Sequence, residues 1–468
     1  MADGMDAGRK DNEIEARTLD EHDWGLYPDV ERFVVEIVDS FLSGNRFAKS
    51  LSESMLAKTS THFIDWIDHI AVGEDIATPH SLAEMGFTEV RNEVPSKEIR
   101  VFRHLKSYLF PVLTGGSGIE IALKPESIDA FLQIVARGQK AQGQPFAPLR
   151  KALISREGNR TLSAVERRGY DGFVVKEPDD IREYLGVMSG FFQRQRYFDD
   201  EEKGMEAVVR QVNDSVKMLR SERVSDAFFR AERSYWQSRN RAGQMQKARQ
   251  DALGLGWGNH DHHTYRSSRE NFTKMIRIFE SMGYRCREKY YAGDKAGWGA
   301  QILEHSICNI VVFTDVDLSP EETHIDFSHE GLPRRNKLGT VGLWVGLHGE
   351  SILQAGMHHL EARFDFERLR SDLEAYGVKV MPPFSYFDFL KQAFTVGDNW
   401  PVERRRLDTL LANGSITQEQ YERFAKEGAL GSHMENLQRQ QGFKGFNKSS
   451  VTKIILETDP RAQHSPGA

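Results

Sequence analysis

The run from Gly258 to Arg266 is the densest group of chemically active side chains in this 468-residue sequence. Because side chains alternate along an extended strand, the run would present two faces. The first face carries two imidazoles, a hydroxyl and a guanidinium, from His260, His262, Thr264 and Arg266. Neutral imidazole is the commonest metal ligand, and a guanidinium is suited to a bidentate carboxylate partner. The pattern predicts a metal site beside a binding site for an organic acid; a polar loop with ordinary surface histidines is the alternative.

A second histidine-bearing segment lies earlier in the chain and is built in the same order. Residues 63–72 are mostly β-branched or aromatic and include His69, which predicts a strand. A helix and several candidate strands follow this segment and also follow the strand at 260–266. Both helices close on Met-Gly-aromatic, at 85–87 and 282–284. We therefore predict two copies of one βαβββ unit in an α+β protein, each copy opening with a histidine-bearing strand.

The rest of the chain is assigned around these two units, with some alternatives left open. The run 342–350 is interpreted as a strand. His358 and His359 could open another unit, because a helical pattern follows them. The expected segments are a disordered N-terminus (1–20), N-terminal helices (21–60), the first unit (61–137), a helical insertion (138–255), the second unit (256–397), a C-terminal helical segment (398–458) and a disordered tail (459–468).

Composition restricts the classes of function. With 39% hydrophobic and 28% charged residues, the chain has the composition of a soluble globular protein, and its net charge of −7 disfavours nonspecific binding to nucleic acid. Basic residues between 230 and 249 alternate with aromatic ones, which a solvated helix with a buried aromatic stripe explains better than a nucleic-acid surface. Two cysteines, no signal peptide and no apolar run of membrane-spanning length predict a cytoplasmic protein without membrane contact.

Paired βαβββ units that open with histidine-bearing strands resemble the vicinal oxygen chelate superfamily. Within it, the segment 258–266 is similar to the strand His-x-Asn-His-x-Thr-x-Arg of the 2-oxoadipate dioxygenase/decarboxylase (hydroxyglutarate synthase) family, with Asp261 in place of the usual asparagine. Leu123-Lys124-Pro125 looks like that family's Phe-Arg-Pro, and residues 385–390 resemble its Tyr-Glu-Asp-Phe-Leu segment. The resemblance implies paired units that form a half-open barrel around a metal.

The resemblance also implies an iron(II) ion held by two histidines and one glutamate. Carried over to this chain, the ligands are His69, His262 and Glu350. Other candidates for the third ligand remain open, namely Glu304, Glu361, Glu120, His358 and His359. The implied substrate-binding residues are Arg266, Thr264 and Lys124, and His260 is expected beside the metal in a catalytic or supporting role.

One departure from the family pattern concerns the substrate. The family places an arginine four residues after its first metal histidine, whereas this chain has Gly73 at that offset from His69. We therefore expect the far end of the substrate to be held differently, and 2-oxoadipate need not be the substrate.

Together, these features predict a non-heme Fe(II)-dependent oxygenase of the dioxygenase/decarboxylase type. Its partners would be dioxygen and a small carboxylic acid, either a 2-oxo acid or an amino acid, that chelates the metal. A metal-dependent isomerase or lyase, or an extradiol-type dioxygenase, is an alternative on the same fold. A non-catalytic protein that binds a small ligand is another.

Overall fold

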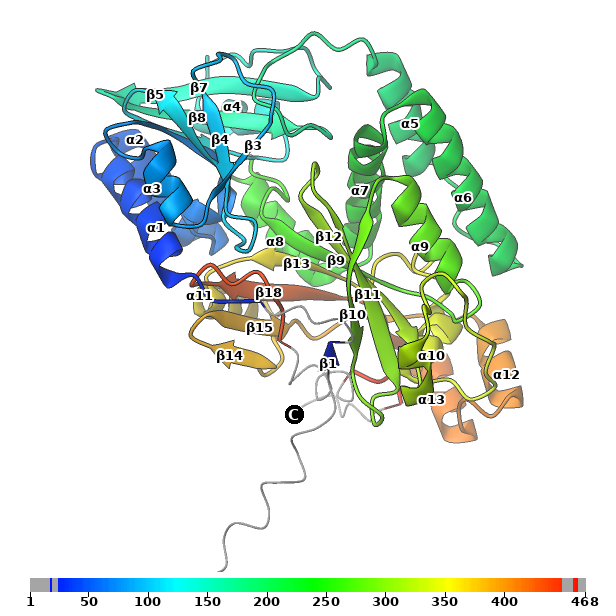
Figure 1. Cartoon of the computed structure of the whole chain (residues 1–468). Coiled ribbons are helices and arrows are strands. Elements are labelled where there is room, and N and C mark those ends of the chain that lie inside the picture. The colour runs from blue at the N-terminus through cyan, green and yellow to red at the C-terminus, as the bar shows by residue number, and fades with distance from the viewer. Residues whose placement is uncertain (1–16, 19–23, 448–457, 462–468) are drawn as a thin grey trace, which may run out of the picture.

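The computed structural model describes residues 17–18, 24–447 and 458–461, which form two mixed β-sheets covered by helices (Figure 1). The two segments expected to be disordered lie mostly outside the described residues. In two places the structure differs from that expectation. Arg17–Thr18 form the edge strand β1, which pairs with β10, and Asp459 accepts a hydrogen bond from the Thr340 hydroxyl.

The first sheet has seven strands in the order β3-β4-β5-β2-β6-β8-β7. One complete βαβββ unit (β2, α3, β3, β4, β5) and one shorter βαββ unit (β6, α4, β7, β8) build it, and they join where β2 pairs antiparallel with β6. The elements are β2 (Ile67–Gly73), α3 (Pro79–Glu84), β3 (Thr88–Val90), β4 (Arg100–Arg103), β5 (Val112–Gly116), β6 (Ile119–Leu123), α4 (Ile128–Val135), β7 (Leu149–Glu157) and β8 (Arg160–Arg167).

The second sheet has nine strands in the order β1-β10-β11-β12-β9-β13-β18-β15-β14. It contains two complete βαβββ units that join where β9 pairs antiparallel with β13. The first unit is β9 (His260–Arg266), α9 (Phe272–Ser281), β10 (Arg285–Tyr291), β11 (Trp298–His305) and β12 (Ile310–Asp317). The second is β13 (His359–Arg363), α11 (Phe366–Ala375), β14 (Ser385–Phe387), β15 (Leu390–Phe394) and β18 (His433–Arg439).

The predicted α+β fold with paired βαβββ units is confirmed, but the chain contains more units than predicted. Each pair forms within one sheet, so the segments 61–137 and 256–397 are not partners in a single sheet. The alternative start at His358 and His359 is the correct one, because β13 opens a further unit. Its last strand lies beyond 397, since the helices α12 (Arg404–Ala412) and α13 (Gln418–Glu427) and the short pair β16 (Asn399–Trp400) and β17 (Ala429–Leu430) precede β18.

The segment expected to be a helical insertion, 138–255, begins with the hairpin of β7 and β8. Gly158 in its turn has a φ of 59°, the left-handed conformation that glycine adopts without strain. The helices follow only after this hairpin. They are α5 (Ile181–Phe192), α6 (Glu201–Met218), α7 (Ser221–Ser238) and α8 (Arg241–Asp251).

The apolar run near 342–350 is a helix, α10 (Thr340–His348), and the predicted strand is wrong. Nearly every side chain of α10 is buried, so the sequence shows no polar face that would distinguish a helix from a buried strand. The carboxylate of Asp317, at the end of β12, accepts hydrogen bonds from the backbone N–H groups of Gly339 (2.7 Å) and Val341 (3.1 Å). These bonds satisfy donors at the start of the helix and fix its position beside the sheet.

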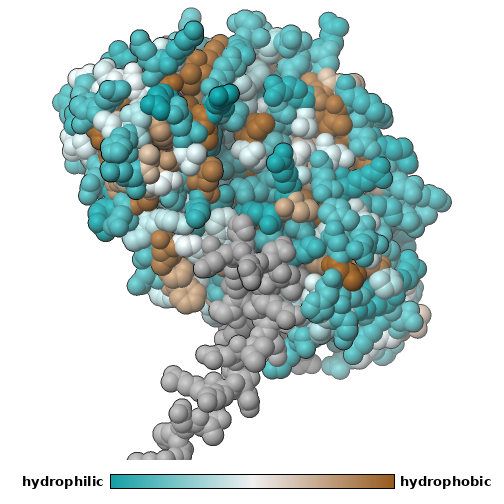
Figure 2. Space-filling model, in the orientation of Figure 1, coloured by the Kyte–Doolittle hydropathy of each residue, from teal (hydrophilic) through white to brown (hydrophobic). Residues whose placement is uncertain are grey.

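Two separate hydrophobic cores stabilise the two sheets. Helices α1 (Pro28–Ser43) and α2 (Arg46–Thr59) pack on the first sheet, and helices α5 to α9 contribute to the core of the second. The face shown in Figure 2 is mainly hydrophilic, with hydrophobic side chains in small separate groups. Within the described ranges, no helix combines the length and the apolar character that a membrane span requires.

Candidate metal centre

A β-bulge in β9 determines which way its histidines face. Opposite β9, Leu360 pairs with His263 and Ala362 pairs with His260, so that Asp261 and His262 together face one residue of β13. Such a bulge interrupts the alternation of side chains. His262, Thr264 and Arg266 therefore line one cavity, whereas His260 lies beside His263, with ring centroids 5.2 Å apart, and lines a different cavity.

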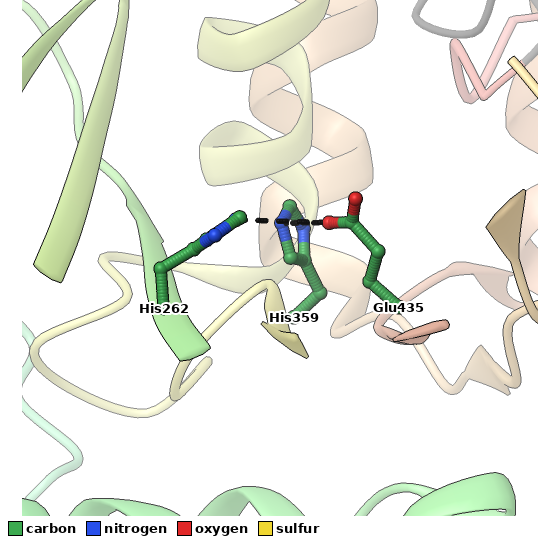
Figure 3. Close-up of side chains that lie close together, drawn as sticks. All are labelled: His262, His359 and Glu435. Atoms are coloured by element: carbon green, nitrogen blue, oxygen red, sulfur yellow. Dashed lines mark ion pairs between the residues drawn. The ribbon is translucent and has the colours of Figure 1, made fainter. Parts of the chain in front are cut away.

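Three side chains from adjacent strands meet in the first of these cavities. His262 of β9, His359 of β13 and Glu435 of β18 point toward one another (Figure 3). Oε2 of Glu435 lies 3.1 Å from Nε2 of His359 and 3.7 Å from Nε2 of His262. Their potential ligand atoms all lie within 4.8 Å of one another, so one cation could contact all three. All three residues are at least nine-tenths buried.

Neighbouring polar groups hold these side chains in place. Nδ1 of His262 lies 2.9 Å from Oε1 of Glu361, which leaves Nε2 directed at Glu435. The amide of Gln392 donates hydrogen bonds to Glu435 (3.0 Å) and to Glu361 (3.3 Å). Hydrogen bonds to the outer side of ligands are the usual means of orienting a metal site. Asp261, His262 and Glu361 form a second potential group, but the carboxylate of Asp261 is already paired with Arg363 and Arg439.

The electrostatics of the cluster favour a bound cation. Burial raises the pKa of Glu435 well above its usual range, and repulsion by Glu361 raises it further. Burial acts to lower the pKa of His262, but the carboxylates of Glu361 and Asp261 outweigh it and raise that pKa to about 9. The cluster therefore holds protons in positions that a divalent cation would occupy. Two imidazoles and one carboxylate are a donor set typical of Fe(II), and they also suit other first-row metals.

The cavity around the cluster combines aromatic walls with one buried guanidinium. Arg266 is 2% exposed, and its Nε and Nη1 have no hydrogen-bond partner among the described residues. Asp315 is the nearest acid in the cavity, with Oδ2 3.7 Å from Nε of Arg266, and burial raises the pKa of Asp315 to about 7. The arginine is thus available to a ligand. The aromatic lining consists of Tyr290, Trp298, Phe313, Phe384, Phe394 and Phe446.

The structure does not bring the three ligands implied by the resemblance together. His69 lies on β2 in the first sheet, where its Nδ1 is 2.7 Å from Asp68, and burial lowers the pKa of His69. Glu350 follows α10, and its carboxylate accepts hydrogen bonds from Ser268 and from Asn271 (3.0 Å) at the start of α9. Burial raises the pKa of Glu350 to about 7, but this side chain supports the helix and is not part of the cluster.

The remaining predicted residues divide between the two cavities. Thr264 belongs with the cluster, because its hydroxyl lies 2.8 Å from Nε2 of His359. Lys124 and His260 line the other cavity, so the structure separates them from Arg266.

Among the alternative ligands, Glu361 and His359 lie at the cluster. The others do not belong to it: Glu120 pairs with Lys151, Glu304 pairs with Lys444 and Arg287, and His358 packs on Trp344.

Sequence reasoning missed Glu435 entirely, because 398–458 was expected to be helical. The run His433-Met434-Glu435-Asn436-Leu437 shows no alternation of polar and apolar residues, so no local signal marked it as a strand. Every residue from His433 to Leu437 is buried, which is typical of a central strand. Polar residues hid this strand from a search for apolar runs.

The fold is α+β and is built from paired βαβββ units. In the second sheet, a complete pair carries the potential metal ligands on its central strands, whereas the first sheet combines one complete unit with a shorter one. No family model matches the sequence, and no curated protein matches it.

Searches of solved structures found proteins of low identity. A variant of 4-hydroxymandelate synthase from Streptomyces coelicolor is 12% identical, with a TM-score of 0.27, over 86% of this chain and 99% of that one. An Mn(II)-bound glyoxalase from Novosphingobium aromaticivorans is 11% identical, with a TM-score of 0.20, over 86% and 96%. Methylmalonyl-CoA epimerase from Mycobacterium tuberculosis is 11% identical, with a TM-score of 0.22, over 39% and 88%.

Proposed function

We propose that this protein is a non-heme Fe(II)-dependent oxygenase that acts on a small carboxylic acid, a 2-oxo acid or an amino acid. The observation that carries the proposal is the cluster of the buried residues His262, His359 and Glu435 in a cavity that also contains Arg266, whose Nε and Nη1 make no hydrogen bond within the described part of the chain. A ferrous ion bound by two histidines and one carboxylate supplies open positions at which an organic acid and dioxygen can bind together.

The side chains around the cluster have separable tasks in this proposal. Glu361 keeps His262 oriented with Nε2 toward the cavity, and Gln392 fixes Glu435 through its amide. Arg266 binds a carboxylate of the substrate through its free N–H groups. The aromatic walls exclude water, which strengthens these electrostatic interactions.

The first experiment is metal analysis of the anaerobically purified chain after reconstitution with iron(II). We expect about one iron per chain. Glu435→Gln and His359→Ala should lose the metal. His69→Ala should retain it, because His69 lies in the other sheet. Equal iron in all four proteins, or none in the wild type, would refute the proposal.

The second experiment measures oxygen consumption by the iron-loaded chain with a panel of 2-oxo acids and amino acids. We expect uptake with at least one of these acids and a raised KM in Arg266→Met. If the chain binds metal but consumes no oxygen with any of these acids, the isomerase or lyase alternative is favoured.

A further inference from the structure

A second cavity, which is partly open to solvent, lies between the two sheets and shares no lining residue with the metal cavity. The first sheet contributes Arg103 from β4 and Lys124 from the end of β6. Helix α7 contributes Arg233, and the second sheet contributes His260 and Arg363. The bulge in β9 explains why His260 belongs here although His262, two residues later, belongs to the metal cluster.

Three cations in this cavity have no carboxylate of the described residues at ion-pair distance, although Asp68, Glu126 and Asp171 also line it. Lys124 and Arg103 make no side-chain hydrogen bond or ion pair within the described ranges. Arg233 is 6% exposed, its Nε has no hydrogen-bond partner, and its Nη1 only contacts Nε2 of His263 at 3.4 Å. Other cations of the cavity differ, since Arg167 is paired with Asp68 and Arg230 with Asp226.

Burying unpaired cations is unfavourable, and the titration of these groups reflects it. Burial lowers the pKa of Lys124 to about 8, and it also lowers the pKa values of Arg103 and Arg233. His260 has a buried Nδ1 without a hydrogen-bond partner among the residues that the structure describes. An imidazole beside these cations can add a hydrogen bond to a bound anion.

We propose that the cavity is a second binding site, separate from the metal centre, for a small anion that carries a carboxylate or phosphate group. Lys124, Arg103 and Arg233 would supply the counter-charges, and His260 a hydrogen bond. The anion would bring one buried cation, Arg233, and two half-buried ones, Lys124 and Arg103, into charge-assisted hydrogen bonds. Elements of both sheets line the cavity, so such an anion would also connect the two halves of the chain.

The test is isothermal titration of the full chain with inorganic phosphate and, separately, with glutarate. The wild type should bind at least one of them saturably, with a dissociation constant below ~1 mM. Tighter binding of phosphate identifies a phosphate site, and tighter binding of glutarate a carboxylate site. Lys124→Met and Arg233→Gln should each weaken binding at least ~10-fold.

A matched control lies on the same strand as Arg103. Arg100 is also on β4, but it is exposed and paired with Glu89. Arg103→Met should weaken anion binding, whereas Arg100→Met should leave it unchanged. Equal binding by these two variants, or no saturable binding by the wild type, would overturn the proposal.

Two further measurements separate this site from the metal centre and from simple misfolding. The variant His262→Ala should keep its affinity for the anion even though its metal site is lost, because the two cavities share no residue. Without anion, Lys124→Met should unfold at the same or a higher temperature than the wild type, because a half-buried charge without an ion pair is removed. A cooperative unfolding transition at that temperature shows that any loss of binding is not a loss of fold.

Discussion

The two central strand pairs, β2 with β6 and β9 with β13, have the same geometry but different chemistry. Each opening strand contains Asp-His at a bulge, Asp68-His69 in the first sheet and Asp261-His262 in the second. In both, the aspartate pairs with an arginine at the end of a later strand, Arg167 of β8 or Arg439 of β18. Each of these aspartate–arginine pairs therefore ties an opening strand to a strand formed later in the chain.

The positions that face the histidine differ between the sheets. In the second sheet, β13 and β18 place Glu361 and Glu435 in register beside His262. In the first sheet, the corresponding pair on β6 and β8 is Ala122 and Ser163. A repeated Asp-His pattern therefore marks a repeated fold, whereas the metal cluster depends on the residues of the partner strands.

The largest expected effect tests this dependence on partner strands. Glu435→Gln should reduce metal affinity more than ~100-fold, because a ligand is lost, whereas Ser163→Ala at the equivalent place should change nothing. Competition with a fluorescent chelator measures both affinities. If both variants bind metal as well as the wild type, the cluster in the second sheet is not the metal site.

The two aspartate–arginine pairs should behave alike in both sheets. Asp68→Asn and Asp261→Asn should each destabilise the chain by ~3 kcal/mol, because each leaves an arginine without its buried partner. Denaturant unfolding measures this loss. A large effect in only one sheet would show that the two pairs are not equivalent.

The pair in the first sheet also predicts a dependence on pH. Burial opposes ionisation of Asp68, but Arg167 and His69 hold its pKa well below the usual range. A depressed carboxyl pKa contributes stability above the unfolded value near ~4, and that contribution is lost as the pH falls toward the folded value. The stability difference between wild type and Asp68→Asn should therefore shrink below pH ~4. A difference that is constant with pH would contradict this account.

Substitution of Glu361 should reduce metal affinity less, because Glu361 contacts His262 but is not one of the three clustered residues. Glu361→Gln should lower metal affinity ~10- to 100-fold, as substitutions of groups that orient ligands usually do. His69→Ala should have the smallest effect, with unchanged metal content and a local loss of the hydrogen bond to Asp68 and of packing against Phe173. A loss of metal in His69→Ala would instead support the ligand set that the resemblance implied.

Much of the fold was visible in the sequence because it repeats. The histidine-bearing strands and the Met-Gly-aromatic helix ends predicted the βαβββ units and the α+β class, which the structure confirms. The number of units was underestimated because β13 is five residues long and α10 looked like a strand. Periodicity does not distinguish an element that is buried on all sides.

Less of the candidate site could be predicted than of the fold. His262 was identified by its neighbours in the chain, but Glu435 joins it only through the pairing of β18 beside β13. Pairing between strands so distant in sequence leaves no local signal. The bulge could not be predicted from the sequence either. Because of the bulge, His260 lines the cavity between the two sheets and not the cavity of the metal cluster.

The position of β18 has a consequence for biosynthesis. This strand lies between β13 and β15, and α12 and α13 precede it in the chain. Until β18 has been synthesised, β13 can pair with β9 on one side only, and its other edge stays unpaired. The first sheet, complete by Arg167, can fold much earlier. The metal centre is thus one of the last parts of the nascent chain to assemble, and a chain that stops before His433 lacks it altogether.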